Sequence, residues 1–301
     1  MNVHAILDII TVSLAGAALR NHKFFSKSIE SPSLAEHLDT TTVQLPEIAG
    51  QGKYEVGADT LVGKLDPAFY ITQWKGDDYA TILYHHGSAE RPFDFRPGSP
   101  TTFKNIFLRA KQPIQANLIA LCAPFHRTSI KYYVTKLGDL ANFVAMLSVS
   151  VKVIDELVLH FKQRQCPRVM VSGISLGGWI TNIHRAYYNT ADVYVPLLAG
   201  AALGDIFTMS IYRKMTGRLA QENPDVLRRV LNFENEFEQV KDDNVYPLLA
   251  CHDQIVRYDR QRACYGEHLV KTLEKGHITT ALVPGDLRAH ILARGDGAPQ
   301  E

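Results

Sequence analysis

The chain has 301 residues, of which 46% are apolar, and its 32 Lys and Arg nearly balance 31 Asp and Glu, for a net charge of +1. This composition excludes a chain that is disordered throughout. A near-zero charge also argues against a general nucleic-acid binder, which must neutralise many phosphates. The four cysteines form no Cys-x-x-Cys pair, which argues against zinc and favours a reduced, cytoplasmic protein.

The first forty residues are expected to form a helical segment packed on the body of the protein. A mainly apolar run from Ile9 to Leu19 is too short to cross a bilayer, which needs about 20 residues. No Lys or Arg precedes it, as the start of a signal peptide would require, although 15–17 resembles a cleavage site. We expect an ordinary amphipathic helix at this place.

Short runs rich in Leu and β-branched residues then alternate with helical segments. This pattern is typical of a mostly parallel sheet covered by helices on both faces, that is, an α/β fold. The two earliest runs alternate more and predict antiparallel entry strands. The eight predicted strands are 41–45, 69–74, 80–84, 117–121, 168–171, 193–198, 245–250 and 278–283.

Apolar residues recur every three or four positions over 137–161, which predicts a helix that ends before Pro167. A shorter helix is predicted from Thr101. Residues 201–244 are far longer than a usual connection of about 2–6 residues and contain periodic pieces. We therefore expect a helical cap at 201–244, inserted after the sixth strand into one core formed by 41–200 and 245–301.

The strongest motif is Gly-x-Ser-x-Gly over 173–177, which follows a predicted strand and precedes a predicted helix. A serine on a sharp strand-to-helix turn has a strained backbone, and side chains two residues to either side would collide. Gly173 and Gly177 remove those collisions, and the helix N-terminus directs amides at developing negative charge. Ser175 is therefore the predicted nucleophile.

At this motif the sequence resembles the α/β-hydrolase superfamily, over about 41–294. The resemblance implies an eight-stranded α/β-hydrolase fold and a turn after the third strand that supplies an oxyanion amide. Here that turn is 85–88, so the amide of Ser88, or of Ala89, would join that of Leu176. The two adjacent histidines of the turn would point in opposite directions, which makes a metal site there unexpected.

The resemblance also implies an acid just after a late strand. Asp253 holds that position in 248–256, although Cys251 stands where the superfamily usually has Gly. Asp205, after the sixth strand, is the rival, since some members of the superfamily place their acid there. Asp259 lies in the next predicted helix and is expected to face solvent.

The general base is expected after the last strand. With 278–283 as that strand, His290 follows it and would reach the C-terminal edge of the sheet, where such sites assemble. His277 precedes the predicted strand and is expected at its opposite end. His252 adjoins Asp253 in sequence and could not readily turn back to be oriented by it.

The resemblance thus implies a serine hydrolase for small-molecule ester or related acyl substrates, with Ser175, Asp253 and His290 as its triad. Leu176 and Ser88 would supply the oxyanion hole, and no cofactor, metal, nucleic acid or membrane span is expected. An acyltransferase or thioesterase would use the same residues. A non-catalytic scaffold on the same fold is a third interpretation, which the intact order of serine, acid and histidine disfavours.

Overall fold

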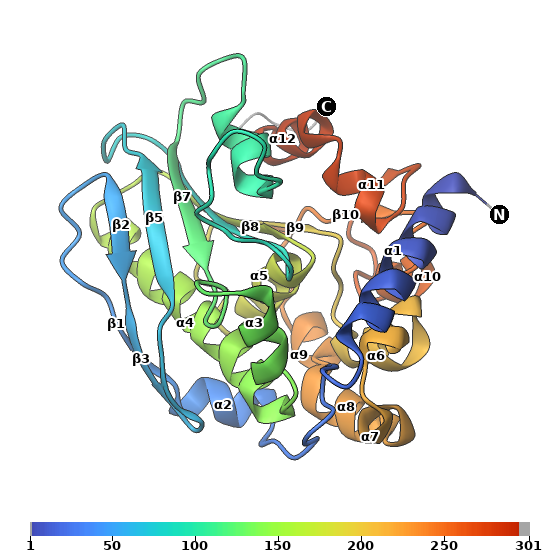
Figure 1. The fold of residues 1–301 in the computed structure, drawn as a ribbon. Coiled ribbons are helices and arrows are strands. Elements are labelled where there is room, and N and C mark those ends of the chain that lie inside the picture. The colour runs from blue at the N-terminus through green and yellow to red at the C-terminus, as the bar shows by residue number, and fades with distance from the viewer. Residues whose placement is uncertain (1, 295–301) are drawn as a thin grey trace.

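The computed structural model describes residues 2–294, and an eight-stranded sheet lies at its centre (Figure 1). The strands of this sheet are β2 Gly52–Glu55, β5 Ala68–Gln73, β6 Thr81–His85, β7 Asn117–Cys122, β8 Val169–Ile174, β9 Val193–Leu197, β10 Leu248–Ala250 and β11 Lys271–Leu273. They lie in the order β11-β10-β9-β8-β6-β7-β5-β2. Along this order, each pair of neighbours from β11 to β7 is parallel. Strand β5 then pairs antiparallel with β7 on one side and with β2 on the other. The predicted α/β fold class is confirmed.

The first predicted strand, 41–45, is confirmed as an antiparallel strand but lies outside the main sheet, and the last predicted strand is wrong. The first of these is β1, Thr42–Gln44, which belongs to a separate sheet with β3 Gly57–Thr60 and β4 Gly63–Leu65. The last predicted strand, 278–283, is not a strand: helix α11, His277–Ala281, occupies most of it. The true last strand is β11, three residues with exposed or half-buried side chains at the sheet edge. Such a short, polar edge strand carries no apolar run that a sequence pattern could show.

Helices cover both faces of the sheet (Figure 1). The predicted helix over 137–161 is confirmed as α4, Leu140–Gln163, whose apolar stripe is buried. On the same face lies α5, Leu176–Tyr187, while the short π-helical η1, Lys104–Leu108, and α12, Pro284–Leu292, contact each other on the opposite face. The remaining helices outside the 201–244 segment are α1 Val3–Leu19, α2 Leu34–Thr40, α3 Ile130–Lys136 and α10 Tyr258–Ala263.

The long segment between β9 and β10 is helical. It contains α6 Leu203–Met209, η2 Ile211–Met215, α7 Arg218–Glu222, α8 Pro224–Leu231 and α9 Glu234–Gln239. The buried Arg185 of α5 holds the end of this segment by donating to the carbonyl oxygens of Val240 and Asp242 at 3.3 and 2.6 Å. Because a buried guanidinium needs acceptors for its N–H groups, these two carbonyls pair with it and fix the return of the chain to the sheet.

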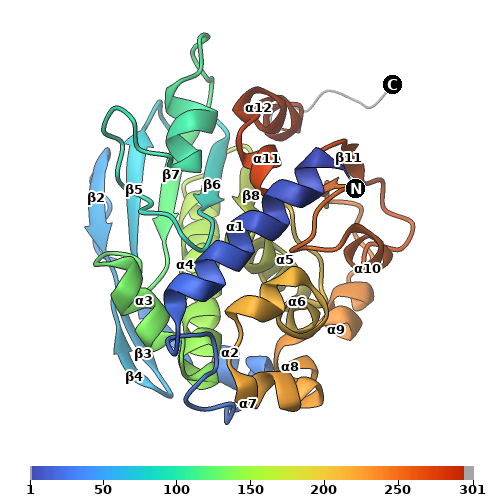
Figure 2. The same ribbon diagram turned by 45° about the vertical axis from the view of Figure 1, so that its right-hand side comes forward.

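Helix α1 runs diagonally across the body between α11 and α3 (Figure 2). It packs against α11 and η2, and its buried residues are small or polar apart from Val12. At Gly16, an added Cβ would lie 2.8 Å from the carbonyl oxygen of Lys214. The inner face of the helix therefore approaches the body through backbone, and its larger apolar side chains lie elsewhere.

The start of α5 lies directly against β6. A Cβ on Gly177 would lie 2.1 Å from the carbonyl oxygen of His85. We predict that Gly177→Ala lowers the free energy of unfolding by about 3 kcal/mol, because strand and helix would have to separate. Denaturant unfolding measures this change. Gly285→Ala is the matched control: nothing lies within 4 Å of its added methyl group in α12, so we expect it to be neutral or to stabilise by up to about 1 kcal/mol.

Candidate active site

Ser175 occupies a strained turn between β8 and α5. Its φ is +53° and its ψ is −112°, a backbone conformation that residues other than glycine rarely adopt. The turn is closed by contact between two glycines, since a Cβ on Gly173 would lie 2.5 Å from the carbonyl carbon of Gly177. The Gly-x-Ser-x-Gly spacing thus has the steric origin that the sequence indicates, and it leaves the hydroxyl at the edge of a cavity.

Asp253 follows β10 and is held in one orientation by its own turn. Its Oδ1 accepts hydrogen bonds from the amides of Ile255 and Val256, at 2.8 and 2.7 Å. The side chain is fully buried. Since two amides fix one oxygen, the other oxygen, Oδ2, points in a defined direction.

His277 lies between this carboxylate and the serine. Its Nδ1 is 2.7 Å from Oδ2 of Asp253, and its Nε2 is 3.0 Å from Oγ of Ser175. Because an ionised carboxylate only accepts, Nδ1 carries the proton and Nε2 is free to accept the serine hydroxyl proton. The three side chains come from segments after β8, β10 and β11, which end at the same edge of the parallel sheet.

His290 does not reach this site, and its expected place as the base is corrected to His277. His290 belongs to α12, and its Nε2 donates to the carbonyl oxygen of Tyr246 at 2.9 Å. The error follows from the last strand: with β11 ending at Leu273, the loop after the last strand carries His277. A Gly-His pair shortly after a three-residue edge strand was the available signal, and the apolar run after it concealed that signal.

The electrostatic surroundings favour a charged imidazole. Burial alone would lower the pKa of His277, but the charge and hydrogen bond of Asp253, together with the charge of Asp8, raise it above the ordinary value. Burial raises the pKa of Asp253, and His277 offsets part of that effect. The imidazole is therefore poised to accept a proton next to a carboxylate that stabilises it.

Asp8 of α1 connects two loops, a role that the sequence did not reveal. One is the loop after β10 that carries Asp253, here called the acid loop, and the other is the loop after β11 that carries His277, here called the base loop. Its Oδ2 accepts from the amides of Gln254 and His277, at 3.1 and 2.8 Å, and its Oδ1 accepts from the amide of Ile278 at 3.0 Å. The carboxylate is fully buried. A Cβ on Gly276 would lie 2.8 Å from Oδ2, so only glycine allows this approach. One charged side chain thus caps α11 and fixes the backbone of both loops.

The turn after β6 lies on the other side of the serine. Its backbone is fixed by His86, whose Nδ1 donates to the carbonyl oxygen of Gly87 at 2.7 Å, and by half-buried Glu90, which accepts from the Gly87 amide at 2.9 Å. Burial raises the pKa of Glu90. Within residues 2–294, the amides of Ser88 and Leu176 donate to no acceptor, and both residues border the same cavity as Ser175. These amides are available to an oxyanion.

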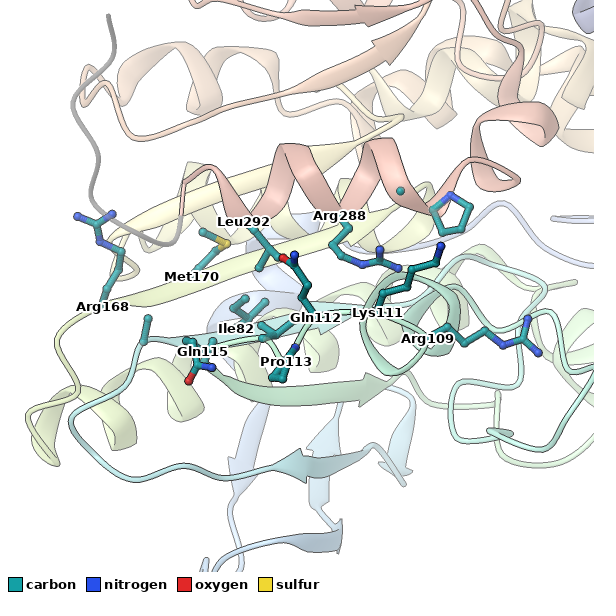
Figure 3. A pocket seen from close by; sticks show the side chains of 16 residues that line it. Ile82, Arg109, Lys111, Gln112, Pro113, Gln115, Arg168, Met170, Arg288 and Leu292 are labelled. Atoms are coloured by element: carbon teal, nitrogen blue, oxygen red, sulfur yellow. The ribbon is translucent and has the colours of Figure 1, made fainter.

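The cavity at Ser175 has a volume of about 520 Å³ and is lined mainly by apolar side chains. A larger cavity of about 690 Å³ lies elsewhere (Figure 3). It is bordered by Ala80 and Arg168, which precede β6 and β8, so it opens at the opposite ends of the strands. Arg288 of that cavity already donates to the carbonyl oxygens of Ile106 and Asn105. Ser175, His277 and Leu176 border the smaller cavity and not this one.

Asp205, the rival acid, is buried in an ion-pair cluster away from the serine. It accepts from Arg228 at 2.8 Å and from Arg260 at 2.6 Å, and so has a structural role. Asp259 is exposed, as predicted. All four cysteines lie within residues 2–294 and are free thiols there.

Cys251, His252 and Glu274 form the one cluster within residues 2–294 whose ligand atoms are close enough for a metal ion, within 4.8 Å of one another. Burial raises the pKa of Cys251, which disfavours the thiolate form that binds metal ions. His252 Nε2 is already 3.0 Å from Glu274 Oε2, and Glu274 is exposed. His252 and Glu274 therefore form a hydrogen-bonded pair of their own, separate from the contacts among Ser175, His277 and Asp253.

No protein-family model and no curated protein matches the sequence. Solved structures do resemble it. Acetyl xylan esterase 1 from Thermoanaerobacterium sp. JW/SL YS485 is 13% identical, with a TM-score of 0.55 over 91% of this chain and 97% of that chain. Acylaminoacyl peptidase of Pyrococcus horikoshii is 12% identical, with a TM-score of 0.57 over 86% of this chain and 43% of that chain.

A third structure, MGS-M2, an alpha/beta hydrolase enzyme from a Medee basin deep-sea metagenome library, is 12% identical. Its TM-score is 0.51, and the match covers 79% of this chain and 96% of that chain. Likenesses at such low identity concern the fold and not the activity. Together with the sheet order they show that this chain has the α/β-hydrolase fold.

We predict that Asp8→Asn lowers the pKa of His277, because the charge of Asp8 contributes to raising it. An NMR titration of the imidazole measures the shift. Asp8→Ala also leaves three amides without their acceptor, and we expect it to lower the free energy of unfolding by about 3 kcal/mol. Asp259→Asn, which removes an exposed carboxylate, is the control and should change neither quantity. An unchanged His277 pKa in Asp8→Asn would contradict this role.

Proposed function

We propose that this protein is a serine hydrolase that cleaves a carboxylic ester or a related acyl bond through an acyl-enzyme. The observation that carries the proposal is the position of His277, within hydrogen-bond distance of both Ser175 and Asp253. Such an arrangement of nucleophile, base and orienting acid makes a serine hydroxyl reactive. The strained backbone of Ser175 supports the same conclusion, since a serine with only a structural role has no need of it.

In the first half of the reaction, Oγ of Ser175 attacks the acyl carbon while Nε2 of His277 takes the hydroxyl proton. The carbonyl oxygen becomes an oxyanion, which the amides of Leu176 and Ser88 stabilise. Each such donor contributes about 3–4 kcal/mol in enzymes where it was measured. The bond to the leaving alcohol then breaks, and the alcohol departs with the proton from His277.

In the second half, water attacks the acyl-enzyme and His277 takes its proton. The serine ester bond breaks, the acid leaves, and the proton returns to Oγ of Ser175. Throughout, Asp253 keeps the proton of the imidazole on Nδ1 and stabilises the imidazolium that forms twice in the cycle. Its two amide donors, Ile255 and Val256, prevent the carboxylate from turning away.

We assign residues 201–244 the role of a cap over the acyl-binding cavity. Side chains from this segment line the cavity beside Ser175. They are Leu203, Ile206, Phe207 and Tyr212. Since these side chains are apolar or aromatic, the cap supports binding of an apolar acyl group and limits the access of water to the acyl-enzyme.

The test is covalent labelling with a fluorophosphonate probe together with hydrolysis of p-nitrophenyl butyrate. We expect Ser175→Ala to lose labelling, and Ser175→Ala and His277→Ala each to lower kcat by about 10³-fold or more, because each removes a member of the triad. His290→Ala is the matched control, since its ring donates only to a backbone carbonyl, and should keep both properties. Full hydrolysis by Ser175→Ala, or loss of activity in His290→Ala alone, would overturn the assignment.

The pH dependence provides a separate prediction. Neutral His277 is the active base, so kcat/KM rises with pH as this residue loses its proton. Because the pKa of His277 is raised, the midpoint of the acid limb should lie above the ordinary value of 6.5. Measurement of kcat/KM against pH in the wild type and in His290→Ala should give superimposable curves. A midpoint below 6.5 is incompatible with the paired imidazole.

A further inference from the structure

The outer face of α1 is apolar. Val3, Leu7, Ile10 and Leu14 are 61%, 41%, 49% and 67% exposed. Their spacing of four and three residues places them in one stripe along the helix. The other exposed residues of α1, all of them within the described part of the chain, are Thr11, Ala17 and Ala18, so this face carries no charge.

An ordinary surface helix buries its apolar side chains and exposes its charged ones, and α1 does the reverse. The only Asp, Glu, Lys or Arg in α1 is Asp8, and it is buried against the catalytic loops. The buried positions Ala5 and Gly16 carry short side chains, while Val3, Leu7, Ile10 and Leu14 are exposed. Contiguous exposed apolar surface on a folded protein marks a site of interaction.

The stripe lies next to the entrance of the Ser175 cavity. Helix α1 packs on α11 and η2, and residues of both line that cavity. Two cavity-lining residues are themselves exposed aliphatics: Leu282 is 72% exposed and Ile130 is 55% exposed. Figure 2 shows α1 passing between α11 and α3, the elements next to these two residues. An apolar surface therefore extends from α1 to the cavity.

Cations flank this surface. Arg20 and Lys23 follow α1, Lys131 adjoins Ile130, and Arg91 borders the cavity. Among residues 2–294 none of these four forms an ion pair. An apolar helix face bordered by basic side chains is the combination that binds a lipid surface with anionic headgroups.

A second copy of the chain fits the α1 stripe less well than a lipid surface does. A helix of 17 residues is about 26 Å long and about 10 Å wide, so its outer face offers on the order of 260 Å². A stable interface needs about 800 Å² from each partner. The stripe also spans only about two heptads, fewer than the three or four of a stable helix pair.

We propose that this surface, the α1 stripe with Leu282 and Ile130, docks on a lipid–water interface. The protein would lie on the lipid, since no helix within residues 2–294 is long and apolar enough to cross a membrane. Docking brings the cavity entrance to the lipid, so that the aliphatic chain of a lipid ester enters the apolar cavity at Ser175. This second statement rests on the proposed hydrolase function, whereas the docking does not.

The test is co-sedimentation with vesicles of phosphatidylcholine mixed with phosphatidylglycerol, using Leu7→Ser/Leu14→Ser. We expect its vesicle partition coefficient to fall about tenfold or more, because two large apolar side chains leave the lipid. Hydrolysis of a long-chain ester embedded in the vesicles should fall in parallel. Hydrolysis of water-soluble p-nitrophenyl butyrate should stay within about twofold, since substitutions at exposed positions outside the cavity have small effects.

Leu61→Ser/Leu159→Ser is the matched control, with two exposed leucines that lie outside this surface, and it should bind vesicles as the wild type does. Wild-type binding should also weaken on phosphatidylcholine alone. Equal binding by both double variants, or a wild-type dimer that becomes a monomer in Leu7→Ser/Leu14→Ser while neither binds vesicles, would overturn the docking. Labelling of the wild type separates the two proposals: a wild-type protein that binds vesicles but takes no fluorophosphonate label refutes the hydrolase and leaves the docking intact.

Discussion

The geometry of the proposed triad depends on one buried carboxylate, that of Asp8. It accepts amide hydrogen bonds from the acid loop at Gln254 and from the base loop at His277 and Ile278. Those loops lie 246 and 269 residues away in sequence. Three amide donors compensate the burial of its charge, which would otherwise be costly. The proposed base is therefore held in register with the proposed acid by a residue from the first helix of the chain.

The parts of the site that sequence reasoning predicted are those with local causes. The Gly-x-Ser-x-Gly turn is a steric requirement within five residues, and its glycines contact each other as such a turn demands. Asp253 occupies a turn whose own amides bind its carboxylate, again a local arrangement. The central strands were readable because they are buried on both faces and hence continuously apolar.

The parts that were missed depend on contacts between distant segments. The edge strand β11 is short, whereas most of the 278–283 segment belongs to helix α11, whose start Asp8 caps at His277 and Ile278. No pattern within that segment reveals a cap supplied by the N-terminus. The same limit applies to α1: its apolar content is visible in the sequence, but the face that it buries is decided by the close approach of Gly16 to Lys214.

Helix α1 carries both Asp8 and the exposed aliphatic stripe. Asp8 points inward and fixes the loops of His277 and Gln254, and the aliphatic stripe of the same α1 points outward. Because both belong to one helix, a displacement of α1 as a whole would also displace Asp8. A surface that held α1 against the body would favour the hydrogen bonds that position the imidazole. Displacement of α1 would instead leave three amides of the catalytic loops without their acceptor. The proposed docking surface and the carboxylate that positions the proposed base thus belong to a single element.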